Sequence, residues 1–319
     1  MKEHIPVMVD QVLEALKPWE EVGTAVDATL GLGGHSGYIL DRCFNSFVIG
    51  FDQDPFAREL ALENLSRFSG RFEIVAENFR HIEKLTQRPG WTGATAVLFD
   101  LGVSNMQITE SERGFSFQES GPLDMRMDAS EGTNSKVTAK DLLDEGSVKE
   151  LTEIFRKYGE EQYAYQIARG IVRHREKGKR LETTADLVEL IREILPAPVQ
   201  RKMGGHPARK VFQALRIAVN DEMDALEEAL DGSIKVIRPG GKILAISYHS
   251  LEDRIVKTKF RKWEEEGLGR SKPRKAITPT ETEIENNHKS RSAKLRIFEL
   301  FIEITRKGDK SDAIHRMPT

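Results

Sequence analysis

The first hundred residues alternate between short apolar runs, rich in β-branched and aromatic residues, and segments with the spacing of a helix. After the second run, residues 55–68 place three leucines among charged side chains, as an amphipathic surface helix does. Strands that alternate with helices favour a parallel sheet covered on both faces, which predicts an α/β fold. The expected strands lie at residues 24–30, 46–52, 71–77 and 95–101.

The strand pattern stops after Leu101, and helical spacing of apolar residues replaces it from about residue 136 to residue 195. Strand character returns only at residues 240–249, after the turn sequence RPGG, and at residues 294–306. The polar segment 267–283 is predicted to be a mobile loop. The economical topology is an α/β core interrupted after its fourth strand by a mainly helical insert. The expected division is a core of residues 1–105 and 206–319 and an insert of residues 106–205 that recognises substrate.

The composition argues against several classes of protein. No apolar run approaches the roughly 20 residues of a membrane-spanning helix, so no membrane partner is expected. Cys43 is the only cysteine, which excludes an internal disulfide and suits a reducing, cytoplasmic location. None of the eight histidines stands at zinc-binding spacing from another histidine or from the cysteine, so no metal site is expected. The oligomeric state is not defined by the sequence, and a homodimer is one assembly open to it.

Charge is distributed unevenly along the chain. Residues 1–105 contain nine Lys and Arg against 15 Asp and Glu. Residues 169–216 contain 12 Lys and Arg against five Asp and Glu, and residues 254–310 contain 16 against nine. Such asymmetry suggests a polyanionic partner on one part of the surface. Solvated helix faces rich in Lys and Arg would give the same counts, so composition alone does not decide between the two.

A glycine-rich loop follows the first expected strand in the sequence DATLGLGGHSGYIL, residues 27–40. A phosphate-binding P-loop needs Lys followed by Ser or Thr after its last glycine, whereas His35 and Ser36 stand there. The dinucleotide pattern G-x-G-x-x-G nearly fits from Gly31 and Gly33, but its third position is Ser36. The loop is therefore no P-loop, and its ligand has to be inferred from other residues.

Polar and aromatic residues follow the next strands at the edge where an open parallel sheet binds ligands. Asp52 stands about 20 residues after the glycine loop, where a carboxylate can accept both ribose hydroxyls. Phe79 and Asp100 follow the third and fourth strands. Each has a structural alternative: Asp52 could cap the next helix, although Asp54 is better placed, and Phe79 could belong to the core. Together they favour a cofactor that contains a nucleoside.

The nucleoside could belong to NAD or to S-adenosylmethionine. Loops that bind S-adenosylmethionine tend to read D-x-G-x-G-x-G, and residues 27–33 follow this frame with Thr29 in place of the first glycine. The later sequence IRPGGKILAIS is similar to the turn and strand common in methyltransferases that use this donor. Each match is weak alone, and jointly they favour S-adenosylmethionine over NAD.

Several longer motifs resemble those of the MraW-type methyltransferases, which methylate N4 of a cytidine in the decoding centre of bacterial 16S ribosomal RNA. The resemblance extends from His4 to about Arg296, and its motifs are HIPVMV, DATLGLGGHS, DLGVSNMQ, ERGFSF, GPLDMRMD, YGEE, FQALRIAVNDE, SYHSLEDRIVK and RSAKLR. It implies a Rossmann-like class I methyltransferase core with a helical insert, S-adenosylmethionine as methyl donor, and 16S rRNA within the small (30S) ribosomal subunit as substrate.

The resemblance also implies a set of cofactor-binding residues, carried over motif by motif. Gly33, Gly34 and His35 would hold the methionine part and its carboxylate. Asp52 would bind the ribose, and Phe79 would flank the adenine. Asp100 and Gln107 would complete the pocket. The chain departs from the family where Asn105 replaces a usual second Ser and where His288 replaces a common Pro.

Catalysis needs acceptors for the hydrogen atoms of the cytosine amine, whose lone pair is delocalised into the ring. Many amino-methyltransferases use an Asp/Asn-Pro-Pro-aromatic loop here, and this chain has DLGVSN instead. We expect Asp100, Ser104 or Asn105 to supply an acceptor. His249 and Ser250 would shape the base pocket from across the crevice. Alternatively, Ser104 and Asn105 merely form a turn.

Three other functions are compatible with parts of this pattern. The first is an oxidoreductase that binds NAD(P) on a Rossmann fold, and the second is a ribosome assembly factor that has lost turnover. The third is a methyltransferase for a small molecule, which would leave the two basic regions unexplained. If RNA is the substrate, the target base must leave its stack, and basic segments should contact the flanking phosphates. The candidate segments are residues 173–180, 201–210 and 289–296.

Overall fold

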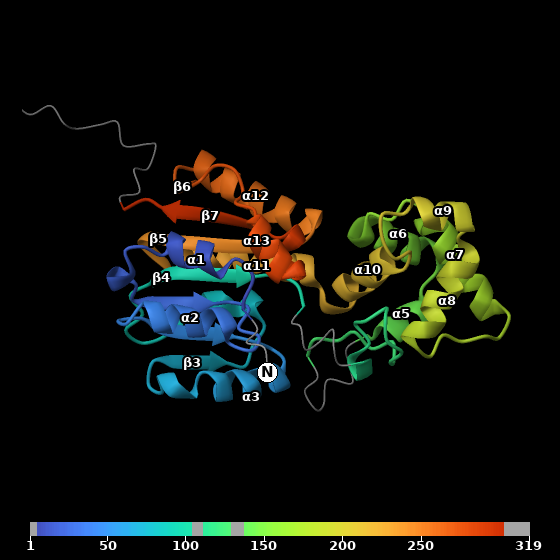
Figure 1. Cartoon of the computed structure of the whole chain (residues 1–319), viewed down its shortest axis with the longest axis horizontal. Helices are drawn as coiled ribbons and strands as arrows, with labels where there is room; N and C mark the ends of the chain where they lie inside the picture. Colours follow the sequence, from blue (N-terminus) through green and yellow to red (C-terminus); the bar gives the residue numbers. More distant parts are fainter. Residues whose placement is uncertain (1–4, 104–110, 129–136, 303–319) are drawn as a thin grey trace, which may run out of the picture.

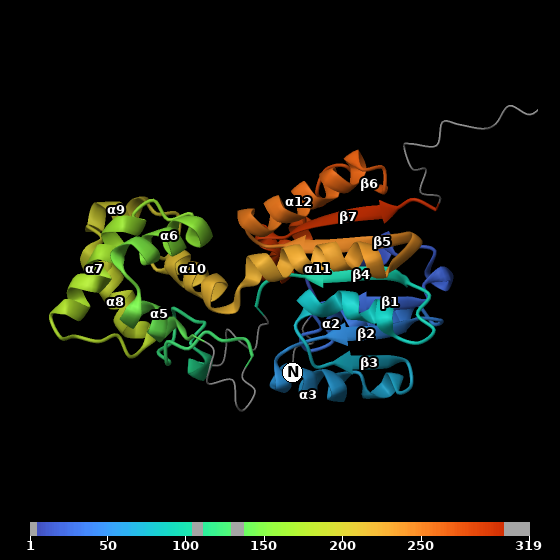
Figure 2. The ribbon, with the colours of Figure 1, turned by 180° about the vertical axis from the view of Figure 1, so that it is seen from behind.

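The computed structural model describes residues 5–103, 111–128 and 137–302. Its described part contains a seven-stranded sheet with helices on both faces, and a cluster of helices beside it (Figure 1; seen from behind in Figure 2). The strand order is β3-β2-β1-β4-β5-β7-β6, in which β7 runs antiparallel to both of its neighbours and the other pairs are parallel. The strands are β1 (Thr24–Asp27), β2 (Phe47–Phe51), β3 (Phe72–Val75), β4 (Ala94–Asp100), β5 (Ile237–Ser247), β6 (Gly269–Ser271) and β7 (Lys294–Leu300).

Both faces of the sheet are buried because neighbouring residues of each strand point to opposite sides. In β4, Leu98 belongs to one apolar cluster and Phe99 to the other, which explains the continuous apolar sequence of this strand. One cluster includes Leu65, just after α3, together with side chains of α1 and α2, and the other includes Phe260 of α12 and side chains of α11. The helices of this part are α1 (Val9–Ala15), α2 (Gly34–Arg42), α3 (Pro55–Asn64), α11 (Glu222–Val236), α12 (Ser250–Glu265) and α13 (Glu281–Asn286).

The expected strands are present, with changes at their ends. The turn sequence RPGG lies inside β5, where the register against β4 shifts between Ala94 and Ala96. The segment 267–283, expected to be a mobile loop, contains β6 and the start of α13. Both elements are short and polar, so they leave no clear periodic signal in the sequence. Among the described residues, no helix is both long and apolar enough to cross a membrane.

The helices beside the sheet pack around an apolar cluster of their own, which includes Phe155, Ile167 and Leu187. Three of these helices begin with a capping box, in which the cap side chain and the third residue bond to each other's backbone N–H. The helices are α5 (Ala139–Glu145), α6 (Val148–Gly159), α7 (Ala164–Glu176), α8 (Thr184–Ile194), α9 (Ala197–Lys202) and α10 (Arg209–Asn220).

Helix α10 extends the helical part beyond the expected boundary at residue 205. Its buried side chains, Val211 and Leu215 among them, join the helical cluster, although residues 206–220 were assigned to the core. Helix α10 ends and α11 begins at Asp221, whose backbone is left-handed with φ 52°. Apolar spacing continues across the boundary unchanged, so spacing alone could not show which body this helix joins. We propose that the insert ends at this junction.

We expect Gly159→Ala to destabilise the contact between α6 and α10. A Cβ at Gly159 would lie 2.6 Å from the Lys210 carbonyl oxygen, so the helices would have to separate. The free energy of unfolding should fall by about 1–3 kcal/mol, measured from urea unfolding followed by circular dichroism. Gly204→Ala is the matched control, because nothing lies within 4 Å of its added Cβ. Equal urea midpoints for the two variants would contradict the packing described.

Candidate functional site

A cavity of about 1000 Å³ opens at the carboxyl ends of β1, β2 and β4. The strand order reverses at this point, since β1 pairs with β2 on one side and with β4 on the other. Open α/β sheets bind ligands at such a switch point. The wall includes the glycine loop, residues just after β2, β4 and β5, and Phe79 at the start of η3. Two residues of the helical part, Met127 and Arg216, also line it. Here η3 is a 3₁₀ helix, Phe79–Gln87.

The glycine loop brings bare backbone to the cavity wall. Gly33 has φ 79°, a left-handed backbone conformation that residues other than glycine rarely adopt. A Cβ at Gly34, where α2 begins, would lie 2.8 Å from Pro6 Cγ. The two glycines therefore allow a tight turn and close contact with the N-terminal segment, and they leave the backbone accessible to a ligand.

Asp52 lies on the wall directly beside this loop. Its Oδ2 accepts a hydrogen bond from the Gly31 amide at 2.9 Å, and its Oδ1 accepts one from the Asp54 amide at 2.8 Å. Burial raises the pKa of Asp52 to about 6, although both amide bonds favour the charged form. Each carboxylate oxygen keeps acceptor capacity for one further donor, which suits the two hydroxyls of a ribose.

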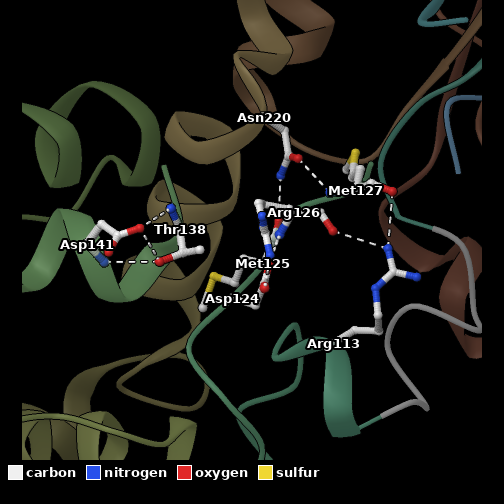
Figure 3. Close-up of polar contacts among 8 residues, drawn as sticks. All are labelled: Arg113, Asp124, Met125, Arg126, Met127, Thr138, Asp141 and Asn220. Atoms are coloured by element: carbon white, nitrogen blue, oxygen red, sulfur yellow. Dashed lines mark hydrogen bonds and ion pairs between the residues drawn. The ribbon is translucent and has the colours of Figure 1, made fainter. Parts of the chain in front are cut away.

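A buried ion pair joins this end of the cavity to the part of the insert that precedes α5. The Asp54 carboxylate caps α3 through the Phe56 amide at 3.1 Å and pairs with Arg113 Nη1 at 2.9 Å. Arg113 Nη2 in turn donates to the carbonyl oxygens of Arg126 and Met127, each at 3.1 Å (Figure 3). We call residues 121–128 the strap.

The strap is held from its other side by α10. The Asn220 side chain accepts from the Met127 amide and donates to the Met125 carbonyl, both at 2.7 Å (Figure 3). These bonds fix Met127 on the cavity wall. In the sequence, ERGFSF and GPLDMRMD are family signatures, and nothing in them or around Asn220 indicates a role for Arg113 or Asn220. Their pairing joins distant parts of the chain, and no local pattern could have shown it.

Asp100, the last residue of β4, lies on the cavity wall and is oriented by two neighbours. Its Oδ1 accepts a hydrogen bond from the Tyr248 hydroxyl at 2.7 Å, and its Oδ2 lies 3.4 Å from His35 Nε2. Burial opposes protonation of His35, but Asp100 and the nearby Asp27 outweigh it and raise the histidine's pKa. Burial, together with the Asp100 charge, raises the pKa of Tyr248, so this phenol stays a hydrogen-bond donor. Tyr248 is a site residue that the sequence analysis did not single out.

His249 and Glu252 line the cavity across from the glycine loop. His249 caps α12, with Nδ1 3.4 Å from the Glu252 amide and Nε2 3.0 Å from Glu252 Oε1. Burial disfavours the Glu252 carboxylate, but His249 and Arg216 outweigh it and lower the pKa of Glu252. Arg216 also forms a two-bond ion pair with Glu222, with both distances 2.8 Å. A buried charged cluster thus forms the wall on the side of the helical part.

The structure brings most of the expected site residues together. Ser250 is the exception, because it does not line the cavity: its hydroxyl donates to Glu160 Oε2 at 2.5 Å. As the first residue of α12 it faces the helical part, whereas the preceding His249 faces the cavity. Phe79 lies on the wall and packs edge to face on Phe99 at 6.2 Å between ring centroids. The remaining expected residues, Ser104, Asn105 and Gln107, lie outside the described residues.

Comparisons with known proteins find similar solved structures and a matching family model. Among solved structures, the chain is similar to a provisionally assigned rRNA methylase from Clostridium thermocellum, with a TM-score of 0.45 and 13% identity over 93% of this chain and 100% of that one. It is also similar to an rRNA methylase from Streptococcus thermophilus, with a TM-score of 0.44 and 10% identity over 93% and 99%. A third is the N-methyltransferase NodS from Bradyrhizobium japonicum WM9, with a TM-score of 0.41 and 9% identity over 92% and 94%.

Likeness at this level carries no argument about function, and the assignment rests on the family model. The model of the MraW methylase family matches residues 1–301. The sheet order, with its antiparallel β7, and the helical insert give the Rossmann-like class I architecture expected from the sequence. The chain belongs to the MraW methylase family and is a methyltransferase.

Proposed function

We propose that this methyltransferase transfers the methyl group of S-adenosylmethionine to N4 of a cytidine in the decoding centre of 16S rRNA, within the small (30S) ribosomal subunit. The observation that carries the donor assignment is the position of Asp52, which lies beside bare glycine backbone in a cavity at the switch point of the sheet. This arrangement suits a nucleoside whose ribose hydroxyls bind the carboxylate and whose tail runs along the glycine loop.

The charge of the wall supports a donor without phosphate. Acidic side chains outnumber basic ones there, which suits a cationic sulfonium and disfavours a dinucleotide pyrophosphate. The acidic residues are Asp41, Asp52, Glu77, Asp100 and Glu252, and the basic ones are Arg67, Arg216 and Lys289. An NAD(P)-dependent oxidoreductase is therefore the weaker alternative.

The described residues can perform three tasks in methyl transfer. Asp52 holds the ribose, and Phe79 flanks the adenine, which together fix the direction of the reactive methyl. Methylation of the amine forms an N–C bond as the bond between the sulfonium and its methyl group breaks, and S-adenosylhomocysteine leaves as a neutral thioether. The amine also loses one N–H proton, so an acceptor must face it. Asp100 is our candidate, because the Tyr248 hydroxyl orients its carboxylate and the preceding strand holds its backbone. His249 shapes the opposite side of the base pocket.

The helical part offers a basic surface for the RNA. Arg173, Lys177, Lys179 and Arg180 are exposed at the end of α7 and in the turn after it. Arg175, expected from the sequence to contact phosphate, instead donates through Nη1 to three carbonyl oxygens at the end of α5, at 2.6–3.1 Å. It stabilises the insert, and the exposed cations around it are the candidates for phosphate contacts.

We expect Asp100→Asn to reduce kcat by about 100-fold or more, because an amide is a weaker acceptor than a carboxylate. The substrate is small subunits from cells that lack this enzyme, and the readout is N4-methylcytidine mapped by mass spectrometry. Glu73→Gln is the control, because this exposed residue pairs with Arg88 outside the cavity and should change kcat by less than about threefold. Absence of methylated cytidine with the wild-type protein would favour a non-catalytic assembly factor, and activity only on small molecules would exclude the RNA assignment.

We expect the affinity for S-adenosylhomocysteine to fall as the pH drops below about 6. The pKa of Asp52 is raised to about 6, so the ionised form that accepts two ribose hydroxyls is complete above this pH and is lost below it. At pH 5 the Kd should be about tenfold higher than at pH 8, measured by calorimetry. Asp52→Asn should bind weakly with a flat pH profile. A pH-dependent Kd that persists in this variant would assign the titration to another group.

We expect the combined substitutions Lys177→Gln, Lys179→Gln and Arg180→Gln to weaken binding to small subunits. Each lost phosphate contact should reduce the slope of log K against log salt by about 0.7–0.9. The control replaces Lys17, Lys84 and Lys235 by Gln, which are exposed lysines on the sheet part that already pair with glutamates. An unchanged salt slope in the first variant would eliminate this surface as an RNA contact.

A further inference from the structure

The segment after β6 closes the end of the cavity beside the start of α2. Glu283 of α13 accepts a hydrogen bond from the Met8 amide through Oε1 at 2.6 Å. Pro6, two residues before Met8, packs against Gly34, since a Cβ on that glycine would lie 2.8 Å from the proline ring. The C-terminal segment therefore holds the N-terminal segment against the first turn of α2.

Lys289 lies at this same end of the cavity. It belongs to η5 (His288–Ser292), and Asn287, just before η5, donates to the Ile5 carbonyl oxygen at 3.3 Å. Lys289 lines the cavity together with Pro6 and His35. Partial burial against the wall desolvates its ammonium group and lowers the pKa of Lys289. A bound anion would reverse this shift.

Lys289 differs from the other cationic side chains of the wall. Arg67 pairs with Asp41, and Arg216 pairs with Glu222. In the described ranges of the chain, no carboxylate forms an ion pair with Lys289. The wall thus contains one lysine whose charge is available to a ligand.

His35 provides a second, independent sign of a ligand at this end. Its side chain is buried in the first turn of α2. Nε2 lies 3.4 Å from Asp100 Oδ2, whereas Nδ1 has no hydrogen-bond partner among the described residues. Buried polar atoms normally find partners, so an unbonded Nδ1 on a cavity wall points to a bound polar group. His35 and Lys289 together offer donors from two sides of the same space.

We propose that Lys289 binds the carboxylate of the amino-acid tail of the methyl donor. This inference rests on the proposed function, since it assigns the tail of S-adenosylmethionine to the end of the cavity beside α2. A carboxylate in an acid-rich cavity needs a cation of its own, and a charge-assisted bond to an ammonium group is the strong form of that contact. The C-terminal segment would then be part of the donor site.

A phosphate of the RNA is the other anion that Lys289 could bind, because residues 289–296 were expected from the sequence to contact RNA. Two of the cations in this segment are already committed, since Lys294 and Arg296 both pair with Asp253. These two cations are therefore partly neutralised and are less available to an RNA phosphate. Lys289 faces the cavity that contains the glycine loop, and this position favours the donor carboxylate.

The test compares two ligands that differ in the tail. S-adenosylhomocysteine carries the amino-acid tail, whereas 5′-methylthioadenosine keeps the nucleoside and lacks the carboxylate. We expect Lys289→Met to raise the Kd for S-adenosylhomocysteine by about tenfold and to leave the Kd for methylthioadenosine within about twofold. Both are measured by calorimetry on the full chain. Lys289→Arg should recover most of the lost affinity.

Arg291→Met is the matched control, because this exposed residue lies in the same 3₁₀ helix and does not line the cavity. It should leave both affinities unchanged. Equal losses for the two ligands in Lys289→Met, or no loss for S-adenosylhomocysteine, would overturn the proposal. Unchanged S-adenosylhomocysteine binding with weaker binding to small subunits would instead assign Lys289 to an RNA phosphate. A wild-type protein that binds neither nucleoside would refute the donor assignment itself.

Discussion

The buried ion pair between Asp54 and Arg113 is the contact on which the geometry of the cavity depends. The Asp54 side chain is 0% exposed and that of Arg113 15% exposed, so the pair is largely shielded from water. Removal of one partner from such a pair leaves an uncompensated buried charge, which typically costs about 3–5 kcal/mol. The same aspartate caps α3 and donates its amide to Asp52. One residue therefore positions a helix, the Asp52 carboxylate and the strap.

The distribution of charge matches two ligands of opposite sign. The sheet part supplies the acidic residues of the cavity, where a cationic sulfonium is expected, and the helical part carries exposed cations suited to RNA. The two parts meet at Glu160, whose carboxylate pairs with Arg254 and accepts from Ser250, both on α12. This contact explains why Ser250 serves the junction between the parts, whereas its neighbour His249 lines the cavity.

The sequence predicted the features that follow from local periodicity. Strand alternation located the parallel sheet, and position at a strand end located Asp52 and Asp100, because all carboxyl ends of parallel strands meet at one edge. Features that join distant segments could not be predicted in this way. The bond of Arg113 to Asp54 spans 59 residues, and that of Tyr248 to Asp100 spans 148. Nothing in the spacing of apolar residues encodes such pairs.

Three contacts in series link the Asp52 end of the cavity to the strap and the helical part. Asp52 accepts from the Asp54 amide, Asp54 pairs with Arg113, and Arg113 donates to the Met127 carbonyl. Asn220 closes this series from α10. A methyltransferase that acts on an everted base must align the donor, held by the sheet, with a nucleotide held by the insert. Because Met127 is fixed by bonds to both parts, the wall between the two ligands is set by the fold before either of them binds.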